Sequence, residues 1–216
     1  MSDTSCMTPV GMMYFPALFS PKANKNNPAA APQYAAVLLL DSAAVQTQAY
    51  QAMRQAVASA ISEKFGAAKA ADPAFVRKLA LPFRDASEKA GESGYPGFED
   101  GDTFFRAWRK EDFDAPGVID LHGEDIVVPG DVWSGQLARF TVRAFAWENT
   151  GKRGVSFGLD HVQIVKKDMP KLGSASASAA FKGAEAADGQ DLSGYGVTGA
   201  LGSSDGGSTP AADLPF

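Results

Sequence analysis

Cysteine, histidine and long apolar runs are scarce in this chain of 216 residues, and each scarcity excludes a class of protein. Cys6 is the only cysteine, so neither an internal disulfide nor a thiolate zinc cluster can form. No run approaches the roughly 18 apolar residues of a membrane span. The first residues also lack the basic and apolar regions of a secretory signal. We therefore predict a cytoplasmic protein without a membrane association.

Motifs of nucleotide-binding and nucleophilic enzymes are missing as well. The stretch ESGYPGFEDGD (residues 92–102) is rich in glycine and acids, but no Gly-Lys-Ser/Thr follows it, which excludes a P-loop. No serine nucleophile elbow occurs. His122 and Glu124 form the His-x-Glu of base deaminases, yet the Pro-Cys-x-x-Cys that completes that zinc site is absent. We expect no enzyme, no cofactor and no metal, and we keep an enzyme using Asp120–Asp125 as a minor alternative.

Two stretches interleave aromatic residues with cations at the period of a β-strand. From Arg139 to Trp147, apolar residues at alternate positions form one face, and the other face carries two arginines, a phenylalanine and a tryptophan. The stretch TFFRAWRK (Thr103–Lys110) likewise places Phe, Arg, Trp and Lys on one face. Flat rings that stack on bases, between cations that meet phosphates, are typical of surfaces that bind single-stranded nucleic acid. The alternative is that the rings belong to the core and the arginines pair with nearby acids.

Charge is unevenly distributed along the chain. The net charge is -5, which by itself argues against a nucleic-acid partner. Residues 139–167, however, hold six cations against two acids, whereas residues 171–216 hold two lysines against five acids. The acidity therefore belongs partly to the C-terminal segment, and the aromatic strand is locally basic.

The first third of the chain predicts a hairpin followed by a helix. Met12–Ser20 is a β-rich run containing Pro16, which indicates an edge or bulged strand, and Tyr34–Leu40 is a buried strand that pairs with it. Asp41 or Ser42 is expected to cap a helix that ends at Gly66 and packs through one apolar stripe.

The middle of the chain predicts loops and short strands. Residues 67–101 are expected to be mostly loop, and Val118–Leu121 and Ile126–Val128 to be short strands. Many short strands with turns about every ten residues are typical of a β-barrel or a β-sandwich.

After Pro170 the composition changes to Gly, Ala and Ser with few β-branched residues. Such a segment cannot bury enough apolar surface to offset its ordering entropy, so we expect residues 171–216 to be disordered. The final residues Asp213, Leu214, Pro215 and Phe216 form a small apolar end with a free carboxylate, and such an end either has no role or is a docking peptide for a partner.

The run from Asp131, DVWSGQLARFTVRAFAWENTGKRGVSFGLDHVQIVKKDMP, resembles the C-terminal half of a group of phage single-stranded DNA-binding proteins. The similarity lies in the Ser134-Gly135 turn, the aromatic strand, the Gly151–Arg153 turn and the Gly-Val…Gly-Leu…Val-Gln segment that follows. The ending Asp-Leu-Pro-Phe is similar to the phenylalanine-terminated tails of such proteins.

The resemblance implies a mainly β fold, an OB-fold-like five-stranded barrel with an inserted helix, over residues 1–170. It implies single-stranded DNA as the partner, and replication or recombination proteins of the phage as partners of the tail (171–216). It places the protein in the host cell cytoplasm. The rival interpretation is a β-sandwich virion or interaction protein that binds no nucleic acid.

The residues expected to bind DNA are aromatic or cationic and lie mainly on the predicted strands and their turn. They are Tyr14, Phe19, Lys22, Phe104, Arg106, Trp108, Lys110, Arg139, Arg143, Phe145, Trp147, Lys152 and Arg153.

Overall fold

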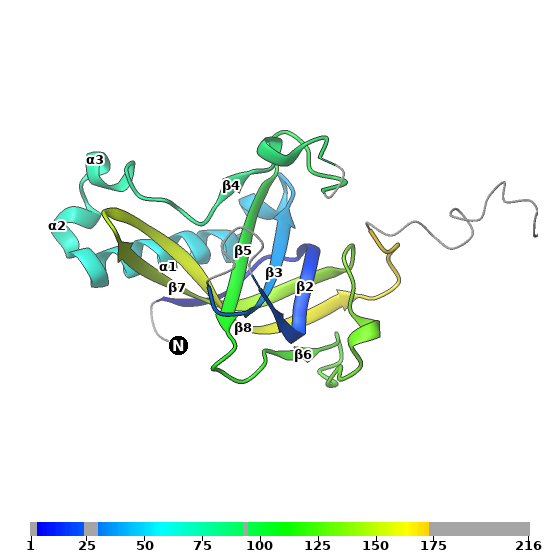
Figure 1. Ribbon diagram of the computed structural model, residues 1–216. Helices are drawn as coiled ribbons and strands as arrows, with labels where there is room; N and C mark the ends of the chain where they lie inside the picture. The colour runs from blue at the N-terminus through cyan, green and yellow to red at the C-terminus, as the bar shows by residue number, and fades with distance from the viewer. Residues whose placement is uncertain (1–3, 24–29, 93–94, 173–216) are drawn as a thin grey trace, which may run out of the picture. The chain divides into compact units, whose positions relative to one another are not determined.

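The computed structural model describes residues 4–23, 30–92 and 95–172 (Figure 1). The fold is mainly β, as predicted. The segment expected to be a disordered tail with a docking peptide at Asp213–Phe216 lies outside the described residues from position 173 onward. In the part of the chain that is described, no helix is both long and apolar enough to cross a membrane.

Three antiparallel strands form the first part of the sheet: β2 (Gly11–Lys22), β3 (Gln33–Leu40) and β5 (Thr103–Lys110). The predicted hairpin of β2 and β3 is confirmed, and so is the bulge, because the register shifts after Tyr14. There Phe15 adopts a left-handed backbone conformation with φ 51°. Strand β2 is an edge only in part: within the described part of the chain the residues after the bulge pair with β3 alone, whereas Gly11 and Met12 also pair with a strand on the other side.

That strand is β7 (Leu137–Asn149), which forms a long hairpin with β8 (Lys152–Lys166). Strand β8 runs parallel to β5, so the pairings lead from β2 through β3, β5, β8 and β7 back to β2. Two short strands extend this arrangement: β1 (Ser5–Met7) pairs with β7, and β6 (Gly117–Ile119) pairs with β8 (Figure 1). The strand predicted at Ile126–Val128 was wrong: this segment is irregular, and only neighbouring Asp125 forms an isolated bridge, with Ile119.

The helix α1 (Gln48–Phe65) ends at Gly66 as predicted, but it begins later than predicted. Thr47, not Asp41 or Ser42, is its N-cap and accepts a hydrogen bond from the Tyr50 N–H. The Asp41 carboxylate instead accepts the Ala44 N–H and closes a separate 3-10 turn, η1 (Ala44–Gln46). The predicted cap was therefore wrong: the Asp41 side chain accepts a backbone N–H as a capping residue does, but it does so at a turn that precedes the helix.

The main core lies between the sheet and α1, whose buried residues are Met53, Ala56, Val57, Ala60 and Ile61. The rings of Phe105, Phe140 and Phe157 meet inside the sheet. The Phe105 and Phe157 centroids are 5.3 Å apart, and the Phe105 and Phe140 centroids are 6.2 Å apart. These residues occupy the alternate apolar positions of their strands, so the predicted inward faces are correct.

The segment from residue 67 to 102 has more structure than predicted. It contains α2 (Ala67–Ala70), α3 (Pro73–Val76), β4 (Arg84–Asp85) and the 3-10 helix η2 (Ala86–Lys89). Its later half covers part of the outer face of the sheet. There Ala86 and Phe98 join Tyr14, Leu39 and Phe104 in a second apolar cluster.

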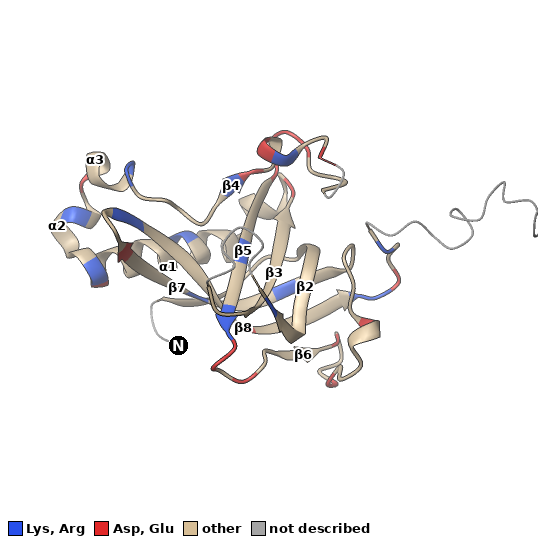
Figure 2. Ribbon diagram, in the orientation of Figure 1, with Lys and Arg blue, Asp and Glu red and all other residues tan. Residues whose placement is uncertain are grey.

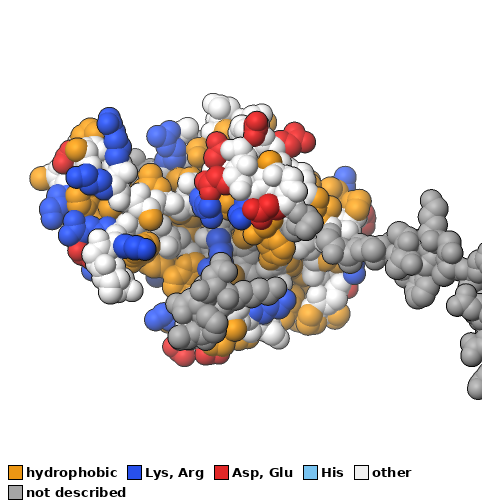
Figure 3. Space-filling model, turned by 45° about the horizontal axis from the view of Figure 1, so that its top comes forward, with side chains coloured by type: hydrophobic (Ala, Val, Ile, Leu, Met, Phe, Trp, Pro, Cys, Tyr) orange, Lys and Arg blue, Asp and Glu red, His pale blue; other side chains and the backbone are white. Residues whose placement is uncertain are grey.

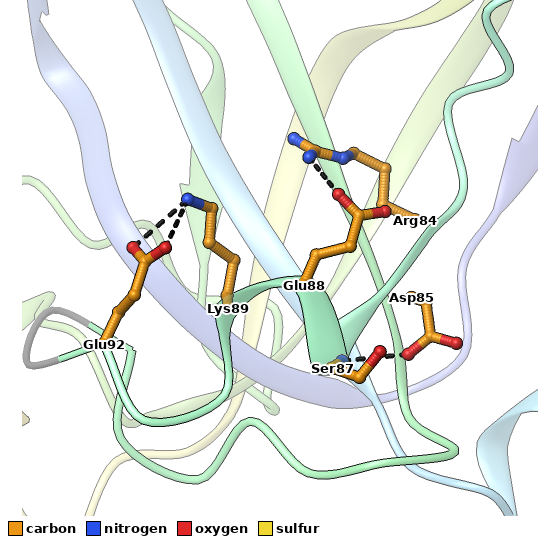
Figure 4. A network of polar contacts seen from close by, with 6 residues as sticks. All are labelled: Arg84, Asp85, Ser87, Glu88, Lys89 and Glu92. Atoms are coloured by element: carbon orange, nitrogen blue, oxygen red, sulfur yellow. Dashed lines mark hydrogen bonds and ion pairs between the residues drawn. The ribbon is translucent and has the colours of Figure 1, made fainter.

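Short-range polar contacts hold this covering segment in shape (Figure 4). Arg84 pairs with Glu88, and the Lys89 ammonium lies 2.8 Å from a Glu92 carboxylate oxygen, which raises the pKa of Lys89. The Asp85 carboxylate accepts hydrogen bonds from Ser87, which lower its pKa. Arg84, Asp85, Glu88 and Glu92 are exposed and Lys89 is half-buried, so each contact shapes the turn more than it stabilises the fold.

Candidate nucleic-acid interface

Where the covering segment leaves the sheet open, β5, β7 and β8 form a hollow of about 430 Å³, here called the central hollow. Strand register brings its parts together, because Gly158 of β8 lies opposite Trp108 of β5 on one side and Arg143 of β7 on the other. Since Gly158 has no side chain, the space between these two residues stays open. The lining residues are Trp108, Arg109, Lys110, Phe113, Arg143, Phe145, Gly158, Leu159 and Asp160.

Two aromatic side chains form one wall of the central hollow. The rings of Trp108 and Phe145 meet edge to face, with centroids 5.6 Å apart and an interplanar angle of 77°. Both side chains are half-buried, so each is fixed by packing while part of its ring remains accessible. Rings held in this way can stack against a planar ligand with little loss of side-chain entropy.

Cations line the rim of the central hollow. Arg143 extends into solvent, and its Nη2 lies 4.0 Å from the Asp160 carboxylate. Arg109 donates to the Asp160 carbonyl oxygen at 3.5 Å, and Lys110 lies beside it on β5. The lining thus contains three cations and one carboxylate, which leaves positive charge available for an anionic ligand.

Arg109 and Phe113 were missed by the sequence analysis. Arg109 was assigned to the opposite face of its strand because its position alternates with Trp108. At the end of β5 both neighbours nevertheless reach the hollow. Phe113 follows the strand and is 56% exposed, and the Arg109 guanidinium lies 5.7 Å from its ring centre. The sequence feature that could have identified Phe113 is an aromatic residue in an acidic turn.

Two of the residues predicted to stack on bases are buried instead. Tyr14 is 1% exposed and Phe104 is 5% exposed, so no base can reach either ring in this structure. Both are covered by Phe98, whose ring centroid lies 5.0 Å from that of Tyr14 and 5.2 Å from that of Phe104. The Tyr14 hydroxyl donates to the Pro96 carbonyl, and burial, with a smaller contribution from Asp102, raises its pKa to about 12.

Four further predicted residues lie outside the central hollow. Phe19 is half-buried and packs against the main core. The Arg106 guanidinium donates to the Gln33 side-chain oxygen at 3.0 Å, and Arg139 donates to that of Gln163 at 2.7 Å. Lys22 lines a separate hollow of about 590 Å³ together with Phe15, Pro16, Tyr95, Trp133 and Ser134.

The remaining predicted residues lie at the end of the β7–β8 hairpin. Trp147 is half-buried, and its indole N–H donates to the Ser156 hydroxyl at 3.0 Å. Lys152 and Arg153 are exposed, and Arg153 pairs with Glu148 at 2.8 Å. All three line another hollow of about 360 Å³, here called the hairpin hollow.

The acidic stretch at Asp120–Asp125 is built into a turn. The Asp120 carboxylate accepts the N–H groups of His122 and Glu124 and lies 3.3 Å from the Lys167 ammonium. These hydrogen bonds lower the pKa of Asp120. Within the described ranges, no group of three or more His, Cys, Asp or Glu side chains is placed to hold a metal ion. The contacts of Asp120 are those of a structural residue.

Comparison with solved structures gives phage proteins of the same fold. The single-stranded DNA-binding protein from bacteriophage Enc34, in complex with single-stranded DNA, has 16% sequence identity and a TM-score of 0.61, over 78% of this chain and 90% of that one. The single-stranded DNA-binding protein gp2.5 encoded by bacteriophage T7 has 17% identity and a TM-score of 0.53, over 82% and 93% of the two chains. A search of curated proteins finds no match.

A family model settles the relationship at the level of sequence. The model described as "Enterobacter phage Enc34, ssDNA-binding protein" matches residues 6–192. This match begins in β1, includes every residue of the central hollow and extends past β8. The chain therefore belongs to the family of the single-stranded DNA-binding protein of Enterobacter phage Enc34.

Proposed function

We propose that this protein binds single-stranded DNA without sequence preference and has no catalytic role. The observation that carries the proposal is the central hollow, where the accessible rings of Trp108 and Phe145 lie among Arg109, Lys110 and Arg143. Every base has a π-face, so stacking on such rings tolerates any sequence, while the cations meet the phosphates. The structural neighbour that contains single-stranded DNA supports the same ligand.

The fold supports the placement of the DNA. The cycle of pairings β2–β3–β5–β8–β7 has the strand order of an OB-fold barrel, with α1 inserted between its second and third strands. OB-folds bind oligonucleotides on the face of their second and third strands and between the loops that join strands 1–2 and 4–5. In this chain those elements are β3, β5, the β2–β3 connection and the turn of the β7–β8 hairpin.

The proposed DNA track begins at the central hollow and follows the outer face of β7. Bases stack on Trp108 and Phe145, and on Trp147 further along the strand. Phosphates meet Lys110 and Arg143, and then Lys152 and Arg153 at the hairpin end. The flanking members of the track are Phe19, Lys22, Arg106 and Arg139.

The rest of the proposal concerns the organisation of the chain. Residues 1–170 form the DNA-binding domain, and residues 171–216 act as a tail whose end, Asp213–Phe216, docks on a replication or recombination protein of the phage. The protein works in the host cytoplasm, where phage DNA is copied. Tail acids also compete weakly with DNA for the cationic surface through screened attraction.

The test is a titration with oligo-dT and, separately, with oligo-dA and a mixed-sequence oligonucleotide. Affinities should be similar for all three, and log affinity should fall linearly with log salt, by about 0.7 per phosphate contact. Saturable binding that does not respond to salt, or no binding at low salt, would contradict the proposal.

A further inference from the structure

One wall of the hairpin hollow lies outside the DNA track proposed above. Its lining combines Trp147, Gly151, Lys152 and Arg153 of the hairpin with Phe75, Lys78, Leu79 and Ala80 of the α3 segment. Figure 1 shows α2 and α3 beside the tip of the β7–β8 hairpin. The residues of α2 and of the α3 segment come from the stretch 67–101, which was predicted to be mostly loop.

Backbone contacts fix this wall against the hairpin. The Ala80 N–H donates to the Arg153 carbonyl at 3.0 Å, and the Ala80 carbonyl accepts the Val155 N–H at 2.9 Å. Gly154 lies between them, and a Cβ at this position would be 2.6 Å from both the Ala80 oxygen and the Trp147 ring. Only glycine permits this approach, so both Ala80 and the Trp147 ring lie directly against Gly154.

The hairpin hollow is strongly cationic. Three of the lining residues named above are cations, Lys78, Lys152 and Arg153, and none of those named is a carboxylate. Lys69 of α2 lies close by, because its ammonium is 5.7 Å from the centre of the lining Phe75 ring. Figure 2 shows these basic positions gathered on α2, the turn after α3 and the hairpin tip, and Figure 3 shows the same concentration of blue side chains at the left of the molecule. In the described parts of the chain, neither Lys78 nor Lys152 forms an ion pair.

An aromatic ring lies among these cations. The Lys69 ammonium is 5.7 Å and the Arg153 guanidinium 5.9 Å from the centre of the Phe75 ring. Phe75 also packs edge to face on Phe65 at the end of α1, with centroids 5.3 Å apart, which fixes its ring while leaving it half-exposed. Cations next to a fixed, accessible ring are the elements that the central hollow also has.

The two hollows are joined along one strand face. Phe145 lines the central hollow and Trp147 lines the hairpin hollow, and both point outward from β7 two positions apart, which is about 7 Å along a strand. A single extended ligand can therefore contact both.

We propose that the hairpin hollow is a second binding station for the same strand of DNA, in which Lys69 and Lys78 contact phosphates and Phe75 faces a base. This inference rests on the proposed function, because it extends the DNA track beyond the sheet onto α2 and α3. The combination of rings with cations favours nucleic acid over an acidic peptide, which would need the charges alone.

The test compares the double variant Lys69→Ala/Lys78→Ala and the single variant Phe75→Leu with the parent protein, using short and long oligo-dT. The two hollows lie side by side along β7, so only an oligonucleotide of about two or three nucleotides can be confined to one station, whereas one of about 20 nucleotides reaches both. Phe75→Leu keeps an apolar side chain against Phe65 and removes the aromatic face. The matched control is Arg54→Ala/Lys166→Ala, which removes two exposed cations elsewhere on the domain.

The lysine variant should bind the long oligonucleotide roughly three- to tenfold more weakly than the parent and lower its salt slope by about 1.4, the value for two phosphate contacts. Binding of the short oligonucleotide and all binding by the control should stay at parental values. Equal losses for both lengths, or the same loss in the control, would reduce the effect to net charge and overturn the inference.

Three outcomes separate this inference from the proposed function. If Trp108→Ala weakens binding while Lys69→Ala/Lys78→Ala and Phe75→Leu do not, the second station is refuted and the central hollow stands. If all of these variants bind DNA as the parent does, the proposed DNA track fails together with the second station, whereas the proposed function itself fails only if the parent does not bind oligo-dT. If the lysine variant loses affinity for polyglutamate and keeps its affinity for long oligo-dT, the hairpin hollow serves an acidic protein instead.

Discussion

Loss of the Trp108 indole should weaken single-stranded DNA binding without unfolding the protein. The ring lies on the outer face of β5, edge to face with Phe145 at 5.6 Å and in register with Gly158. Replacing a stacking aromatic by alanine costs about 1–3 kcal/mol of binding free energy. For Trp108→Ala this corresponds to a Kd about 5- to 150-fold higher at 25 °C.

The assay is fluorescence anisotropy of labelled oligo-dT, with the melting temperature of each variant measured in parallel. The matched control is Phe104→Leu, four residues before Trp108 on the same face of β5. The Phe104 side chain is only 5% exposed, because Phe98 covers it. It should lower stability by about 1 kcal/mol through imperfect repacking and leave the Kd unchanged. If Trp108→Ala changes only the melting temperature, or if Phe104→Leu changes the Kd, the division of this face into open and covered parts is refuted.

Further predictions concern charge, acid stability, the thiol and the tail. Arg143→Ala should make the salt dependence of log affinity shallower by about 0.7, and an unchanged slope would remove it from the phosphate track. Because the pKa of Asp120 is lowered in the folded protein, its ionised carboxylate stabilises the fold at pH values above the ordinary carboxyl pKa of about 3.9, and this stabilisation is lost as the pH falls through the lowered pKa. Asp120→Ala should therefore destabilise the protein at neutral pH and have a smaller effect in acid, which urea unfolding at the two pH values measures. Burial raises the pKa of Cys6 to about 11, so a thiol reagent at about pH 8 should label it only on unfolding; rapid labelling of the folded protein would contradict this. Deleting residues 174–216 should leave the melting temperature nearly unchanged and strengthen DNA binding modestly at low salt, and a marked fall in the melting temperature would show that this segment is part of the folded domain.

The strands that carry the central hollow were predictable because their signal is local. Alternation in β5 and β7 identified Trp108, Lys110, Arg143 and Phe145, and strand pairing brings these four together. A period of two fixes which side chains share a face without any knowledge of the neighbouring strand. The hairpin of β2 and β3 followed from the same pattern.

The covered part of the same face was not predictable in this way. Tyr14 and Phe104 have the same local pattern as Trp108, and only the position of Phe98, from a segment read as loop, decides that they are core. The prediction for the start of α1 failed for a related reason, because the Asp41 carboxylate accepts the Ala44 N–H before a 3-10 turn, and this contact has the same local chemistry as a helix start. In each case the outcome depends on tertiary contacts, which the periodicity of a single segment does not reveal.

The return of the strand pairings to β2 has a consequence for folding during synthesis. The Thr8 hydroxyl accepts the Phe140 N–H, which joins positions 132 residues apart, and β8 joins β5 only after β7 has been made. At a translation rate of about 5–20 residues per second, the N-terminal strands wait on the order of ten seconds for these partners. Once β5 has been made and until β7 and β8 follow, β2 lacks its second partner and β5 is paired on the side away from β3 only by the short strand β4, so a ribosome that pauses before residue 137 exposes a three-stranded sheet to aggregation. Codon choice upstream of β7 should therefore affect the yield of folded protein more than codon choice after β8.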